Sequence, residues 1–176
     1  MITGRQKNLA SVSEHRMNAN HLKTYMKDHY AGSVAALQLL DHLVSSNSGK
    51  PEELLFIALR REVGEDQNTL QKMLHDLDAT EGLMRNTVAF VGEKLSRIKL
   101  LLEDPSGSQL ALLEKLEALA LGIEGKRALW HALEAVAADA PTLRKVDFAQ
   151  LNQRAETQRK RVEALRIEAA REAFTL

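Results

Sequence analysis

Residues 148–171 read FAQLNQRAETQRKRVEALRIEAAR, and apolar residues recur in this stretch every three or four positions. That spacing is the period of one face of an α-helix. The face is formed by Phe148, Leu151, Ala155, Gln158, Val162, Leu165 and Ala169. Since a lone helix cannot hide such a face from water, the stretch predicts a helix packed against others. Its single polar member, Gln158, lies near the middle.

Three other segments share this design. We expect helices over about residues 20–45, 51–77 and 108–138, with Asn20 as the N-cap of the first and Asp147 as the N-cap of the last. Their apolar faces are interrupted by His29, Asp66 and Arg127. Four helices with inward polar groups at a common depth predict a bundle with a polar centre.

Composition narrows the class of protein. The 176 residues are 44% hydrophobic, and 24 Lys and Arg balance 24 Asp and Glu. Abundant Leu and Ala favour an all-α fold. Zero net charge argues against nucleic-acid and anionic-membrane binding. The chain has no cysteine and no apolar run of membrane-spanning length, so we expect a cytoplasmic protein. We predict a flexible lead-in over 1–18 and a single domain over 19–176.

A fifth segment has an uninterrupted apolar face. It consists of Met84, Val88, Val91, Leu95, Ile98 and Leu102, and it ends at the breaker around Pro105. A helix of about 23 residues would span roughly 35 Å. Such a segment could travel back along the bundle as a crossover, so that the helices on either side of it in the sequence run parallel.

Four short stretches carry a resemblance to a known family. They are DHYAGS at 28–33, EDQN at 65–68, GIEGKR at 122–127 and RAET at 154–157. In this pattern the chain resembles the ferritin-like superfamily, most closely the small bacterial stress-associated proteins of the YciF/YciE type. The resemblance covers roughly residues 20–172. It implies a ferritin-like up-down four-helix bundle with an additional crossover helix, five helices in all.

The resemblance also raises a di-metal site for iron or manganese. The candidate ligands are His29, Glu62, Glu65, Asp66, Glu124 and Glu156. The di-metal members of the superfamily use paired Glu-x-x-His motifs, and this chain contains none. Arg127 follows Glu124 by three residues, where a permanent cation competes with a metal for the carboxylates.

We therefore favour a structural network, with Asp66 and Glu124 paired to Arg127 or Arg159. Gln158 and His29 would satisfy the remaining groups. The predicted function is that of a non-catalytic accessory protein without a cofactor. One alternative is a di-metal carboxylate protein that oxidises or stores iron or manganese. The other is a helical partner-binding module, with homodimerisation through the Leu and Ala faces of the helices around 84–102 and 108–138.

Overall fold

The computed structural model describes residues 18–80 and 108–175. These residues form four α-helices and no strand: α1 (Ala19–Ser46), α2 (Glu53–Asp76), α4 (Gln109–Val136) and α5 (Phe148–Phe174). The all-α prediction is confirmed for this part of the chain. The predicted lead-in, except for its last residue, and the predicted helix over 84–102 lie outside the described residues.

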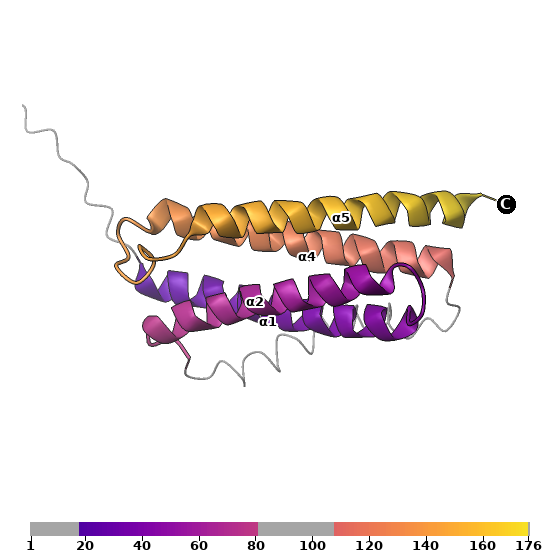
Figure 1. Cartoon of the computed structure of the whole chain (residues 1–176). Coiled ribbons are helices and arrows are strands. Elements are labelled where there is room, and N and C mark those ends of the chain that lie inside the picture. The colour runs from indigo at the N-terminus through magenta and orange to yellow at the C-terminus, as the bar shows by residue number, and fades with distance from the viewer. Residues whose placement is uncertain (1–17, 81–107, 176) are drawn as a thin grey trace, which may run out of the picture.

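The helices lie side by side along one axis (Figure 1). A short connection turns α1 back into the antiparallel α2, and a longer one turns α4 back into α5. α2 and α4 run in the same direction, as do α1 and α5 (Figure 1). α4 packs against both α5 and α1, while α1 packs against α2. No described helix is long and apolar enough to cross a membrane.

Side-chain caps set the starts of three helices. The side chains of Asn18, Ser108 and Asp147 accept hydrogen bonds from backbone N–H groups three residues ahead. Each satisfies a donor that the first turn of a helix leaves unpaired. The predicted cap at Asp147 is confirmed. The cap predicted at Asn20 is wrong, because Asn18 accepts the bond from His21 and the helix begins two residues earlier.

Two apolar clusters fill the bundle, one toward each end. The first gathers large side chains from all four helices, among them Met26, Leu70, Trp130 and Phe148. The second contains another set from the same helices, among them Leu40, Phe56, Leu116 and Val162. Along every helix the break between the clusters falls at the same level, near residues 31–35, 66, 126 and 158. The polar centre predicted from the sequence lies at this level.

Candidate functional site

Three polar side chains from three helices meet between the apolar clusters. Asp66 of α2 is 2% exposed and Gln158 of α5 is 0% exposed. The side chain of Lys126 of α4 is 14% exposed. Its Nζ lies 2.5 Å from Asp66 Oδ2 and also donates to Gln158 Oε1. One ammonium group therefore ties α4 to both α2 and α5.

The Gln158 amide is oriented by its neighbours. Its Oε1 accepts from the Lys126 ammonium, while its Nε2 donates to Glu62 Oε2 at 3.2 Å and to Asp66 Oδ2 at 3.4 Å. The reverse orientation would place the amide N–H groups against the cation and its oxygen against two carboxylates. Gln158 thus links a cation to two acidic groups without adding charge to the interior.

Two arginines of α5 complete the cluster from its edge. Arg161 forms an ion pair with Glu62, and Arg154 pairs with Glu65 at 3.3 Å and with Asp66 Oδ1. The contact between Arg154 and Asp66 is an ion pair only, because Asp66 Oδ1 accepts no hydrogen bond of acceptable geometry. These pairs join α2 to α5. We call these seven residues the polar centre: Glu62, Glu65, Asp66, Lys126, Arg154, Gln158 and Arg161.

Burial and pairing act in opposite directions on the charges of the polar centre. Burial lowers the pKa of Lys126, because desolvation disfavours the ammonium, although the Asp66 carboxylate opposes this shift. For Glu62, desolvation would raise the pKa, but hydrogen bonds from Arg161 and Gln158 outweigh it and lower the pKa. The pairing therefore keeps Glu62 ionised at neutral pH.

The lowered pKa of Glu62 predicts an acid-sensitive contribution to stability. This contribution is fully present above the ordinary pKa of 4.5 and is lost as the pH falls through the lower pKa of the folded state. Urea unfolding of the wild type and of Glu62→Gln, measured from neutral pH down to about pH 3, checks this. We expect the stability of Glu62→Gln to fall less steeply in acid. If the unfolding free energies of the two proteins fell equally with pH, the pairing of Glu62 with Arg161 and Gln158 would be contradicted.

The structure corrects the predicted position of the central cation. Arg127 was expected there, but its side chain is 35% exposed and bonds to Glu124 at 2.8 Å and to Glu156 at 3.4 Å on the outer side of α4 and α5. Arg159 also pairs with Glu156, at 3.1 Å. Lys126, one residue earlier, takes the central place. Asp66 consequently pairs with Lys126 and Arg154, and Glu124 is not part of the polar centre.

The candidate metal ligands fall into separate places. Glu62, Glu65 and Asp66 lie in the polar centre, where each has a cationic partner. Glu124 and Glu156 share Arg127 on the outer face. The ring of His29 meets that of Tyr25 edge to face, with 4.6 Å between the centroids. Within residues 18–80 and 108–175, no three His, Asp or Glu side chains are arranged to hold a metal ion.

Two spaces border the polar centre. On one side, His29 and Lys126 line an apolar cavity of about 100 Å³ between α1 and α4. Gly32 and Gly122 also line it, and a Cβ atom at either position would meet open space. On the other side, an open groove of about 550 Å³ between α2 and α5 is lined entirely by polar side chains, including Arg154 and Arg161. The edge of the polar centre is therefore accessible from this groove.

The sequence reasoning missed Lys126, Arg154 and Arg161. A signal for Lys126 was present, because Leu119 and Leu133 lie seven residues to either side of it and both are buried. The equivalent neighbours of Arg127 are Ala120 and the acidic Glu134. Because the heptad neighbours of Lys126 are both apolar, the helix face that contains Lys126 is the one expected to point into the bundle.

In comparisons with known proteins, the chain matches no family model, no curated protein and no solved structure.

Proposed function

We propose that this chain is a non-catalytic, ferritin-like bundle protein whose polar centre is a structural network and not a metal site. In this proposal the helix predicted over about residues 84–102 is the fifth, crossover helix. The parallel course of α2 and α4 supports it, since α2 ends and α4 begins at opposite ends of the bundle (Figure 1). The protein would act as a small accessory scaffold.

The position of Lys126 is the observation that carries this proposal. Its ammonium contacts both Asp66 and Gln158 at the level where a ferritin-like protein holds its metals. A divalent ion placed there would meet a fixed positive charge and would have to displace it from the carboxylate. On the side of the groove, Arg154 pairs with Asp66 and Arg161 pairs with Glu62, so a metal ion would have to displace these cations too. The chemistry of these residues suits ion pairing better than metal binding.

Metal retention tests the proposal. The purified, tag-free protein is incubated with Fe(II), Mn(II) or Zn(II), freed of excess metal and examined by elemental analysis. We expect well below one metal ion per chain. A Lys126→Met variant is measured in parallel, because removal of the ammonium frees Asp66 for a metal. If only the variant retained metal, Lys126 would be what prevents binding.

One outcome would overturn the structural reading and support the di-metal alternative. That outcome is near-stoichiometric retention by the wild type that is lost when Glu62 and Asp66 are replaced together by Gln and Asn. A matched control replaces Glu124 and Glu156 by Gln, since these residues lie on the outer face of the bundle. Retention that was lost in both double variants would indicate non-specific binding to surface carboxylates.

A further inference from the structure

Four seams run along the bundle where neighbouring helices meet: α1 with α2, α2 with α5, α5 with α4, and α4 with α1. Ion pairs cross the first three of them, namely Arg60–Asp41, Arg161–Glu62 and Arg127–Glu156. The α1–α4 seam differs, because the apolar cavity beside the polar centre lies in it. The bundle therefore has one apolar seam and three charged ones.

Two glycines make the space in the α1–α4 seam. Gly32 and Gly122 lie at the middle of α1 and of α4, and both line the cavity of about 100 Å³. Glycine inside a helix is less favourable than alanine, because its backbone loses more freedom on folding. A Cβ atom at either position would meet open space, so no packing among the described residues requires a glycine there. A side chain that enters the seam from elsewhere would require one.

The chain between α2 and α4 is the occupant whose length fits this seam. α2 ends and α4 begins at opposite ends of the bundle (Figure 1), and the 27 residues 81–107 join them. α4 has 28 residues and is about 42 Å long, at about 1.5 Å per residue. A helix of about 23 residues covers roughly 35 Å. The helix predicted over about 84–102, with a few residues at each end, therefore matches the length of the bundle.

The chemistry of the predicted helix selects among the four seams. Its apolar face consists of Met84, Val88, Val91, Leu95, Ile98 and Leu102, and such a face has to be buried. On a charged seam it would cover ion pairs such as Arg60–Asp41, whose side chains are about half exposed, and their loss of water would be costly. On the α1–α4 seam it would meet apolar side chains, among them Ala36, Leu119 and Leu129.

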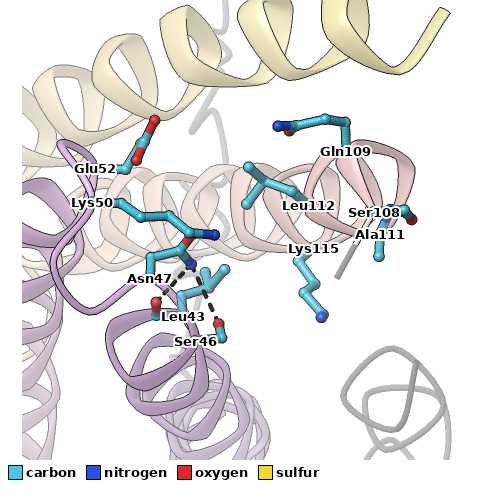
Figure 2. A pocket seen from close by; sticks show the side chains of 10 residues that line it. All are labelled: Leu43, Ser46, Asn47, Lys50, Glu52, Ser108, Gln109, Ala111, Leu112 and Lys115. Carbon is cyan, nitrogen blue, oxygen red and sulfur yellow. Dashed lines mark hydrogen bonds between the residues drawn. The ribbon is translucent and has the colours of Figure 1, made fainter. Parts of the chain in front are cut away.

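The start of α4 lies beside α1, which favours the same seam. Ser108 is the first described residue after the connecting chain, and its hydroxyl caps α4 by accepting from the Ala111 amide. Ser108 and Ala111 line a small cavity together with Leu43 and Ser46 from the end of α1 (Figure 2). The chain therefore enters α4 where the α1–α4 seam ends.

We propose that the helix predicted over residues 84–102 packs its apolar face along the α1–α4 seam, with a large side chain from its middle in the space beside Gly32 and Gly122. This inference rests on the crossover helix of the proposed function and adds the surface to which that helix binds. Val91 and Leu95 lie nearest the middle of the predicted helix, so they come to the level of the two glycines. The docked helix shields the cavity wall at Lys126 from water.

Disulfide trapping in the full chain tests the proposal, because the chain has no cysteine of its own. Leu95→Cys is combined with Gly122→Cys, oxidised with copper–phenanthroline and examined by gel electrophoresis and mass spectrometry. We expect an intramolecular disulfide to form several-fold faster than in two matched pairs, in which Leu95→Cys is combined with Gly64→Cys or Thr157→Cys. Gly64 lies two residues from Asp66 on α2, and Thr157 lines the groove between α2 and α5.

Filling the space beside the glycines is the second measurement. Gly122→Leu should lower the melting temperature by several degrees, because the new side chain competes with the docked helix for the same volume. The matched control is Gly64→Leu, since a Cβ atom there also meets open space among the described residues. This control should leave the melting temperature unchanged or raise it, because leucine favours a helix more than glycine does. Far-ultraviolet circular dichroism checks that both variants stay helical.

Four results would overturn the proposal, each in a distinct way. A faster disulfide with Gly64→Cys or Thr157→Cys would place the crossover helix on another seam. No intramolecular disulfide at any of the three positions would contradict the crossover helix itself, while metal retention still tests the polar centre separately. Disulfide-linked dimers that form faster for Gly122→Cys alone than for Thr157→Cys alone would assign the seam to a second copy of the chain. A higher melting temperature for Gly122→Leu would show that the space is empty.

Discussion

Replacing Asp66 with alanine is expected to lower the free energy of unfolding by about 3–5 kcal/mol, because it leaves a buried cation without its carboxylate. Lys126 would keep only the oxygen of Gln158 as a close partner. Arg154 would keep Glu65, so the uncompensated charge is mainly that of Lys126. Urea unfolding monitored by circular dichroism measures the loss, with the slope of the transition checked for a change in the denatured state.

Two positions that are less buried than Asp66 provide matched controls for this prediction. Glu65→Ala removes the neighbouring carboxylate of the same helix, whose side chain is about half exposed, and should cost no more than about 1 kcal/mol. Arg127→Ala should leave the melting temperature nearly unchanged, since its ion pairs lie on the outer face. A loss for Asp66→Ala as small as that for Glu65→Ala would contradict this account, because it would show that water solvates the Lys126 ammonium in the variant.

The helical faces were predictable because apolar spacing reports directly on burial. The seven positions given for the last helix, from Phe148 to Ala169, are all buried in the structure. The N-cap at Asp147 was equally readable, since it directly precedes the first apolar position of that face. Both features depend on residues close together in the sequence. The polar positions Asp66 and Gln158 were found in the same way, as interruptions of otherwise apolar rows.

The partners within the polar centre were less predictable because they depend on the rotation of one helix. Residues 126 and 127 both lie three or four positions from Ile123 and from Trp130, so either fits the apolar spacing. Adjacent residues point about 100° apart around a helix, and that rotation alone decides which cation enters the centre. Arg154 and Arg161 were missed for another reason: long side chains reach inward from the edge of a helix face.

Replacing the three innermost polar residues together should have the opposite effect from removing one. In the triple variant Asp66→Leu, Lys126→Met and Gln158→Leu, Glu62 keeps Arg161 and Glu65 keeps Arg154. The two apolar clusters then join through side chains of similar volume. Because the desolvation of a buried ion pair often exceeds its Coulomb attraction, we expect stability equal to the wild type or higher by about 1–4 kcal/mol. Urea and thermal unfolding measure this.

The triple variant also separates stability from specificity. The polar centre sets the register of the helices. If α4 shifted along its axis by one turn, Lys126 would be buried against apolar side chains and Asp66 would lose its partner. Without it, the continuous apolar faces can slide, and we expect weaker near-ultraviolet circular dichroism and broader amide resonances despite unchanged helix content. Stability reduced by the sum of the single replacements would contradict this account, since the network would then contribute net free energy of its own. A more stable but less uniquely packed bundle would identify helix register as the task of Asp66, Lys126 and Gln158.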